Sequence, residues 1–140
     1  HHPSSAASDV YKRQLIGKSF LPLLDNKNPS VFGFLSARVG SISDNNLGGW
    51  HAYRASKASL NMLIKNFAIE LARTNKFAKV IGLHPGTVDT QLSKPFQKNV
   101  PDNKLFTPQF SADAMINVVD GLKEGDSGSV FAFDGSKIES

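Results

Sequence analysis

A tyrosine and a lysine, Tyr53 and Lys57, stand four residues apart in the stretch HAYRASKASLNML. Positions four apart share one face of a helix, so the phenol and the ammonium would be neighbours. An unperturbed phenol titrates near pH ~10, and a nearby positive charge lowers that pKa. A phenol tuned in this way can exchange a proton with a hydroxyl or carbonyl oxygen. The residues around the pair are small and would let a flat ligand approach: Ala52, Ala55, Ser56 and Ser59.

The pair alone is weak evidence, because short motifs match by chance and an interfacial tyrosine beside a solvated lysine is the ordinary alternative. The surrounding pattern strengthens it. Residues 51–74 predict a long helix that begins at the pair, with a buried stripe at helical spacing: Leu60, Leu63, Ile64, Phe67, Ala68 and Leu71.

Strands and helices are expected to alternate along the chain. Three short apolar runs bounded by turn signals predict buried strands: residues 30–36, 78–83 and 129–133. Helices are expected at residues 15–24, at residues 91–97 as a short piece, and from Ser111, as N-cap, to Leu122. This alternation indicates an α/β fold with a parallel sheet.

Ligands bind beyond the carboxyl ends of the strands in an open parallel sheet. Three loops leave the predicted strands at that edge: residues 37–49, residues 84–91 and the segment from Asp134 onward. The helix that carries Tyr53 and Lys57 begins directly after the first loop. The order of elements therefore places the pair at the ligand-binding edge of the sheet.

The composition limits the class of protein. The chain has 140 residues, which fits one domain or part of one. It contains no cysteine, which excludes disulfides and thiolate metal sites. The net charge of +4 is spread among acids without a basic run, so a nucleic-acid module is disfavoured. No apolar run has the length of a membrane span, and we expect a cytoplasmic protein without a secretory signal.

The opening of the chain differs from the rest. Residues 1–14, HHPSSAASDVYKRQ, show neither helical nor strand periodicity, and the character turns apolar abruptly at Leu15. We expect residues 1–14 to be a non-native or disordered leader, because the stretch resembles translated adapter sequence. A native disordered N-terminus is the alternative. Residues 15–140 would then form the carboxyl-terminal part of a domain.

Three segments follow one another in a specific order: SARVGSIS, then YRASK, then HPGTVDT after the next strand, with FAFDG near the end of the chain. Together they resemble the carboxyl-terminal half of the short-chain dehydrogenase/reductase family, in the branch of C-factor and sniffer-type carbonyl reductases. The resemblance extends from Leu15 to Ser140. It implies a partial doubly wound, Rossmann-type parallel sheet of three strands with flanking helices, from which the amino-terminal half is missing.

The resemblance also implies an activity and the residues that perform it. Such proteins transfer a hydride between a nicotinamide cofactor and a small carbonyl or alcohol substrate. Tyr53 would give or take the proton, and Lys57 would lower its pKa and bond the nicotinamide ribose. The loop after the next strand would border the nicotinamide and bond its carboxamide, through Pro85, Gly86, Val88 and Thr90.

The serine that polarises the substrate oxygen is harder to place. Its usual position in the family corresponds to Ala37 in this sequence. Ser41 lies twelve residues before Tyr53, close to the usual separation, and is our first choice. Ser36 is the second choice, with a backbone-bonded strand-end serine as its alternative role.

Two departures from the family concern the cofactor site and the active site. The glycine-rich phosphate loop is absent, so the resemblance implies NAD or NADP, with NADP slightly favoured, and does not settle the choice. The place of the family's active-site asparagine falls on Gln14. We therefore expect the isolated 140-residue chain to be inactive, and the unpaired edge of its first strand to promote association. A non-enzymatic signalling or protein-binding module of the same fold is the alternative.

A few further residues have open or ordinary roles. Trp50 is compatible with two positions, beside the substrate or as an anchor of the helix start. His51 and His84 are expected to be loop histidines and not metal ligands, because no other ligating residue stands at suitable spacing. The helix after Tyr53 is a candidate homodimer interface, as the resemblance implies.

Overall fold

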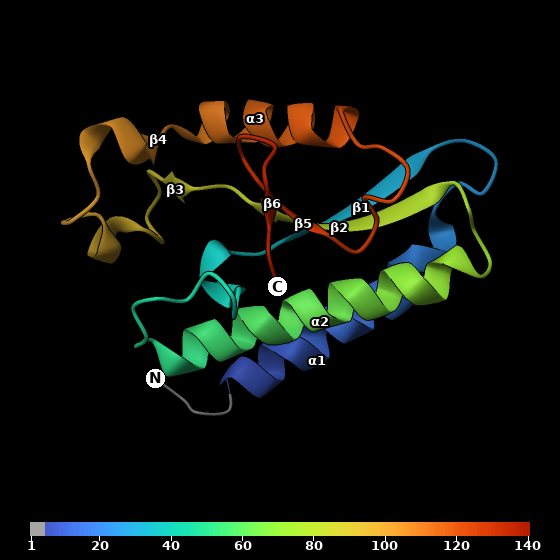
Figure 1. Cartoon of the computed structure of the whole chain (residues 1–140), viewed down its shortest axis with the longest axis horizontal. Helices are drawn as coiled ribbons and strands as arrows, with labels where there is room; N and C mark the ends of the chain where they lie inside the picture. The colour runs from blue at the N-terminus through green and yellow to red at the C-terminus, as the bar shows by residue number, and fades with distance from the viewer. Residues whose placement is uncertain (1–4) are drawn as a thin grey trace.

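The computed structural model describes the backbone of residues 5–140 and the side chains from Val10 onward. Its centre is a four-stranded sheet with the strand order β1-β2-β5-β6. Helices α1 and α2 cover one face of this sheet, and α3 covers the other (Figure 1). The elements are α1 (Ser5–Phe20), β1 (Ser30–Leu35), α2 (His51–Ala72), β2 (Ala78–His84), β3 (Thr87–Val88), β4 (Leu105–Phe106), α3 (Pro108–Asp120), β5 (Val130–Ala132) and β6 (Lys137–Ile138).

The first three strands of the sheet are parallel, as predicted. β1 pairs with β2 from Ser30 opposite Ala78 onward, and β2 pairs with β5 in the same direction. The short β6 adds an antiparallel strand beside β5, which the sequence pattern did not indicate. β1 therefore forms one edge of the sheet within the described part of the chain. The α/β class and the parallel arrangement are confirmed.

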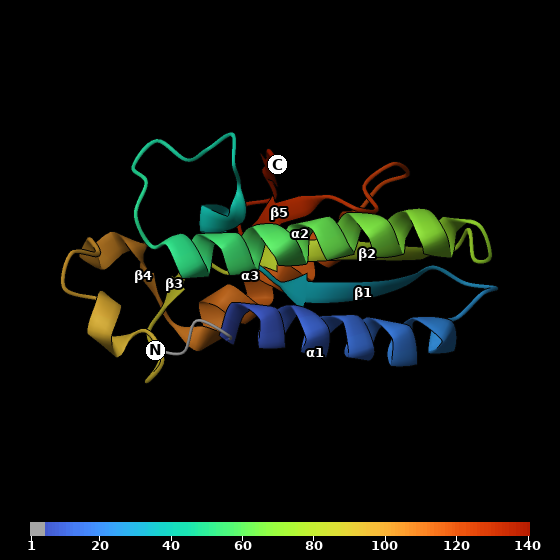
Figure 2. The ribbon, with the colours of Figure 1, turned by 90° about the horizontal axis from the view of Figure 1, so that it is seen from below.

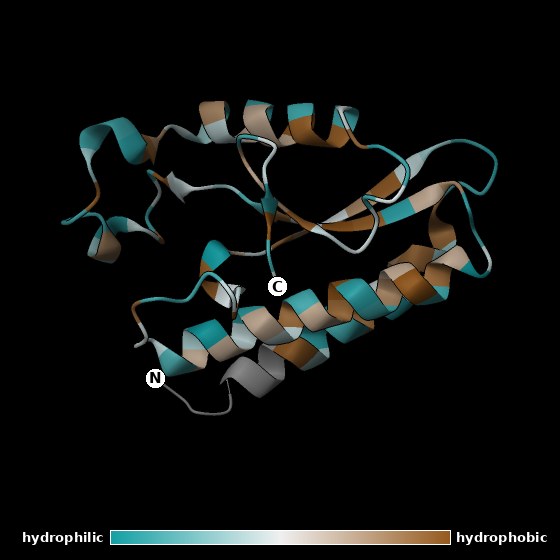
Figure 3. Cartoon of the chain, viewed as in Figure 1, coloured by the Kyte–Doolittle hydropathy of each residue, from teal (hydrophilic) through white to brown (hydrophobic). Residues whose placement is uncertain are grey.

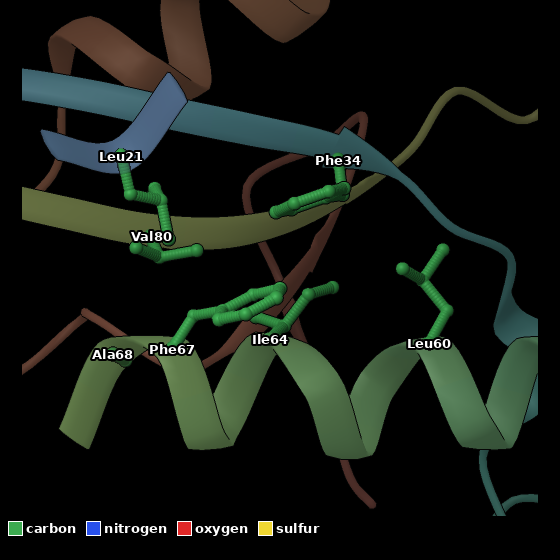
Figure 4. Packing of buried hydrophobic residues seen from close by; sticks show 7 residues of the cluster. All are labelled: Leu21, Phe34, Leu60, Ile64, Phe67, Ala68 and Val80. Atoms are coloured by element: carbon green, nitrogen blue, oxygen red, sulfur yellow. The ribbon is translucent and has the colours of Figure 1, made fainter. Parts of the chain in front are cut away.

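A closed apolar core fills the space between the sheet and the α1–α2 layer. Figure 2 shows the two helices running side by side along this face. Alternation along β2 sends Val80 toward these helices and Ile81 toward α3, and both are fully buried. The cluster in Figure 4 contains Leu21, Phe34, Leu60, Ile64, Phe67, Ala68 and Val80. The predicted stripe of α2 is thus confirmed, with Leu63 and Leu71 partly buried at its margins.

The core beneath α3 is smaller. Its buried members are Ile81, Leu83, Phe131 and, from α3 itself, Val118. An open apolar groove of about 300 Å³ lies beside them, lined by Leu83, Ala112, Met115, Ile116 and Val119. The colouring in Figure 3 shows the hydrophobic residues concentrated along the central strands, with mixed colours on the helices.

The first helix begins earlier than predicted. We expected a helix over residues 15–24, but α1 starts at Ser5 and ends at Phe20, where a 3-10 turn begins at Leu21. Residues 5–16 contain neither glycine nor proline, so nothing in this segment interrupts a helix. Residues 1–4 of the expected leader lie outside the described part, and residues 5–14 lie in α1. That the leader is non-native stays a prediction.

The third helix has a different N-cap from the one predicted. Thr107 caps α3, because its Oγ1 accepts the N–H of Phe110 at 3.1 Å and Pro108 occupies the first helical position. Ser111 lies one turn further in and is buried. Residues 91–97 form only the 3-10 turn Lys94–Phe96, in which Pro95 has no N–H to continue a helix. The two-residue pair β3–β4 was not expected.

No helix in the described part of the chain combines the length and the apolar character that crossing a membrane requires.

Candidate active site at the carboxyl edge of the sheet

Helix α2 presents Tyr53 and Lys57 on one face, one turn apart. Tyr53 is half-exposed in the first turn, and the Lys57 Nζ lies 5.9 Å from the centroid of its ring. The same ammonium donates a hydrogen bond to the carbonyl oxygen of Leu35 at 3.3 Å. Because Leu35 is the last residue of β1, the lysine joins the helix to the end of the strand. The predicted neighbourhood of phenol and ammonium is thus present.

The pKa of Tyr53 differs from the sequence-based expectation. We expected the ammonium of Lys57 to lower it, but burial raises the pKa of the Tyr53 phenol above its ordinary value. Removal from water disfavours the charged phenolate. The lysine stands over the ring, where it makes a cation–π contact. In this structure Tyr53 is therefore a neutral phenol at pH 7, in the form that donates a proton.

The two candidate serines have different hydrogen bonds. Ser36 is buried, and its Oγ donates to Oδ1 of Asn61 at 2.6 Å. Ser41 is also buried, and its Oγ accepts the N–H of Asp44 at 3.1 Å. Among the described residues, the Ser41 hydroxyl thus has no acceptor for its own hydrogen and can donate a hydrogen bond. The Ser36 hydroxyl already donates its hydrogen bond to Asn61.

The turn that precedes Ser41 packs directly on α2. A Cβ added to Gly40 would stand 2.8 Å from both the carbonyl carbon and the Cβ of Lys57. Only glycine allows this approach without a shift of the helix backbone or the turn. Gly40 therefore brings the Ser41 segment to the part of α2 that carries Lys57.

The loop after β2 is held from two sides. The carbonyl oxygen of Pro85 accepts the hydroxyl of Ser111 in α3 at 2.9 Å. Gly86 has a φ of +78°, and an added Cβ would lie 2.6 Å from the ring of Phe106. Val88 pairs with Phe106 through the β3–β4 ladder. The backbone of this loop is thus fixed by α3 and β4, and it ends at the exposed Thr90.

His84 connects the ends of the first two strands. Its Nδ1 accepts the backbone N–H of Arg38 at 3.4 Å, and its ring lies against Phe133 with 6.5 Å between centroids. The pKa of His84 is lowered to about 4, mainly by burial and also by the charge of Arg38, while Asp134 opposes the change. The imidazole is therefore neutral at pH 7. In the described part of the chain no three histidine, aspartate or glutamate residues are grouped as metal ligands would be.

The structure brings most of the predicted site residues to one edge of the sheet. Lys57 reaches the end of β1, Tyr53 lies one turn before it at the start of α2, and Gly40 packs the segment of Ser41 against α2 beside Lys57. The loop after β2 follows at the same edge. Gln14, the residue at the place of the family's asparagine, lies exposed in α1.

Three polar residues at this edge were missed by sequence reasoning. Asn61 holds Ser36, and a signal existed, because Asn61 lies four residues after Lys57 on the same face of the helix. Ser111 holds Pro85, but its pattern was taken for a helix cap. The Ser93 hydroxyl donates to the carbonyl oxygens of Val88 and Thr90, and so it stabilises the turn in which the loop after β2 ends.

Residues 37–101 match the model of the family described as short chain dehydrogenase. The C-signal protein of Myxococcus xanthus is 38% identical over 104 residues, which cover 74% of this chain and 57% of that protein. The chain spans between 49% and 59% of the length of the first curated relatives that it matches.

Solved structures with the same arrangement include two carbonyl reductases. The carbonyl reductase Sniffer of D. melanogaster superposes with a TM-score of 0.80 at 23% identity, over 96% of this chain and 55% of that one. The NADPH-bound carbonyl reductase from chicken fatty liver superposes with a TM-score of 0.65 at 30% identity, over 79% of this chain and 42% of that one. The first of these likenesses concerns the fold alone.

Proposed function

The chain belongs to the short-chain dehydrogenase/reductase family, and we propose that it is the catalytic part of an NADPH-dependent reductase of small carbonyl compounds. One observation carries this proposal. Tyr53 and Lys57 share a face of α2 at the edge where the loops after β1 and β2 meet. Parallel α/β sheets bind their ligands at that edge.

The residues divide the reduction of a carbonyl group between them. The reduced nicotinamide, when bound, supplies the hydride that reaches the carbonyl carbon. Tyr53 donates its proton to the carbonyl oxygen, so that the product is an alcohol. The phenolate left behind is stabilised by the ammonium of Lys57. Ser41 donates a hydrogen bond to the substrate oxygen and polarises the carbonyl group before transfer.

The raised pKa of Tyr53 favours the reductive direction. Reduction needs the protonated phenol, which is the form present at pH 7. Oxidation of an alcohol needs the phenolate, so its rate should rise with pH up to the pKa of Tyr53.

The described residues fit the nicotinamide end of the cofactor. Lys57 offers an ammonium, Thr90 an exposed hydroxyl, and Gly86 a stretch of backbone without a side chain. The likeness to an NADPH-bound reductase supports NADP over NAD. No described loop has the glycine-rich pattern that binds the phosphates, and so we expect the isolated chain not to turn over.

Two expectations about association accompany this proposal. The open edge of β1 supports self-association of the isolated chain. A homodimer through α2 remains a prediction, and the exposed Met62 and Ile69 of that helix support it.

A chimaera tests the proposal. Residues 15–140 would replace the matching part of the D. melanogaster Sniffer reductase, which supplies the amino-terminal half. We expect NADPH consumption with a small carbonyl compound by the chimaera and none above background by the isolated chain. Turnover by the isolated chain would refute its inactivity. A folded chimaera that binds NADPH without turnover would refute the reductase assignment.

A second candidate is a non-enzymatic signalling or binding module. The likeness to the C-signal protein supports it. In that case the active-site pair would have no effect, so a Tyr53→Phe chain would bind its partner as well as the original.

A further inference from the structure

Trp50 stands immediately before the active-site helix in an unusual conformation. Its φ of 49° and ψ of 44° are left-handed, and it is the only residue other than glycine with a positive φ in the described part of the chain. Gly48 and Gly49 share this conformation, with φ of 67° and 71°. A left-handed bulky residue costs free energy, and such residues gather at functional sites.

The conformation leaves the indole in the solvent. Trp50 is 63% exposed and lies three residues before Tyr53. It packs against Phe96 with its ring edge-on, at 6.5 Å between centroids and 66° between planes. A tryptophan that merely anchored the helix start would be expected to bury its ring in the core, which Trp50 does not do.

Phe96 follows the other loop that borders the site, the loop after β2. It belongs to the 3-10 turn Lys94–Phe96, six residues after Thr90, and is 64% exposed. Its turn is tied back to the loop by the bond between Ser93 and Val88 and by the ion pair of Lys94 with Asp89. The two loops that border the candidate site thus each extend one exposed aromatic ring, and these rings meet.

We propose that Trp50 and Phe96 form an aromatic clamp that binds the ring of an aryl carbonyl substrate beside Tyr53. This inference rests on the proposed function and names the substrate class of the same site. Both rings would lose exposed apolar surface on binding, which favours association. An aromatic ligand also gains the edge-to-face and stacked contacts that a saturated ring of similar size cannot make.

The clamp predicts a preference between two matched ketones. Acetophenone and cyclohexyl methyl ketone share the reacting group and differ in the aromatic character of the ring. We expect acetophenone to bind about fivefold more tightly, which is the scale of one or two aromatic contacts. Because the clamp contacts the ring and not the reacting atoms, the preference should appear in KM more than in kcat.

Binding can be followed without turnover, because Trp50 is the only tryptophan of the chain. The chain labelled with nitrogen-15 gives a single indole N–H signal, which reports on the clamp itself. Each ketone is titrated into the 140-residue chain, and the ratio of KM values is measured in the chimaera. Phe96→Leu keeps an apolar side chain and removes the ring. Phe20→Leu is the matched control, because Phe20 is 52% exposed and ends α1, at the far end of α2 from Trp50 (Figure 1).

The clamp predicts a saturable indole shift with acetophenone and a weaker one with cyclohexyl methyl ketone. It also predicts that the preference for acetophenone disappears in Phe96→Leu and persists in Phe20→Leu. Equal affinity of the original chain for both ketones, no indole shift, or an unchanged preference in Phe96→Leu would overturn it. Tyr53→Phe separates the two proposals. If the indole signal still shifts but neither the original chimaera nor Tyr53→Phe turns over, the reductase is refuted and the clamp remains. Turnover without a preference between the two ketones refutes the clamp alone.

Discussion

The two faces of the sheet position the two halves of the candidate site by different means. On the α2 face, Ile64 and Val80 are fully buried and the helix that carries Tyr53 and Lys57 is fixed by close packing. On the α3 face, Ile116 is 57% exposed and an open groove lies beside the core. The loop after β2 is held there by a hydrogen bond from Ser111 to Pro85, by the short β3–β4 ladder and by aromatic contacts around Gly86.

This difference shows how the chemistry is divided. Tyr53 and Lys57, the proposed proton-transfer pair, lie on an element whose position is set by burial of apolar surface, which is large and non-directional. The loop that would border the nicotinamide is set by a few directional contacts. Mutations should therefore affect global stability on the first face, and mainly local geometry on the second.

The largest expected effect compares one isoleucine from each face. Ile64→Ala should lower the free energy of unfolding by about 3–4 kcal/mol, because it leaves a cavity in a closed core. Ile116→Ala should lower it by less than about 1 kcal/mol, because that side chain is mostly in water. Urea unfolding of the two variants measures both values. Equal losses would contradict the distinction between the faces.

A pair of glycines sharpens the comparison within the second half. Gly86 and Gly135 have similar φ values of +78° and +85°, so alanine strains the backbone alike at both. Only at Gly86 would the new Cβ meet aromatic rings, whereas nothing lies within 4 Å at Gly135. Gly86→Ala should cost about 2–3 kcal/mol and Gly135→Ala about 1 kcal/mol. Thermal unfolding checks the difference, and identical melting temperatures would show that packing at Gly86 is unimportant.

The lowered pKa of His84 predicts how the free energy of unfolding depends on pH. Its pKa is about 4 in the folded chain and near 6.5 when unfolded, so the unfolded state binds more protons between these values. Stability should therefore fall as the pH decreases from about 6.5 to 4, by roughly 2 kcal/mol after allowance for its partial exposure.

The variant His84→Asn provides the control, because an amide oxygen can accept the N–H of Arg38 and does not titrate. Its unfolding free energy should lack this part of the pH dependence. The same slope in both proteins would mean that another group causes it.

The smallest expected effect concerns the bond that holds the loop to α3. Ser111→Ala removes the hydroxyl that Pro85 accepts and should cost about 1 kcal/mol. In the chimaera it should raise the dissociation constant of NADPH severalfold, because the loop that borders the nicotinamide loses its tether. Ser59→Ala is a matched control, since Ser59 bonds only within α2. Unchanged NADPH binding in Ser111→Ala would show that this tether is dispensable.

The sequence predicted the elements whose signals are local. The apolar stripe of α2 has a clear helical period, and the runs of β1 and β2 are bounded by turn signals; the positions of all three elements are confirmed. The start of α1 was missed because residues 5–14 carry no apolar stripe, and β3–β4 because two-residue strands have no period.

The site was predicted in part. The pair of Tyr53 and Lys57 follows from helical spacing, and the family resemblance suggested Ser41 and the loop of Gly86. The raised pKa of Tyr53 and the roles of Asn61 and Ser111 depend on burial and on contacts between distant segments, which spacing does not encode. The catalytic and cofactor roles of these residues, and of Ser36, Pro85, Val88 and Thr90, stay predictions.

The most direct measurement of the central claim is the turnover of the chimaera with Tyr53→Phe. This change removes the hydroxyl and keeps the ring that Lys57 contacts. If Tyr53 donates the proton, kcat should fall by a factor of about 100 or more while the dissociation constant of NADPH stays the same. A loss of less than about threefold in kcat, with the variant folded and binding NADPH, would show that another group supplies the proton.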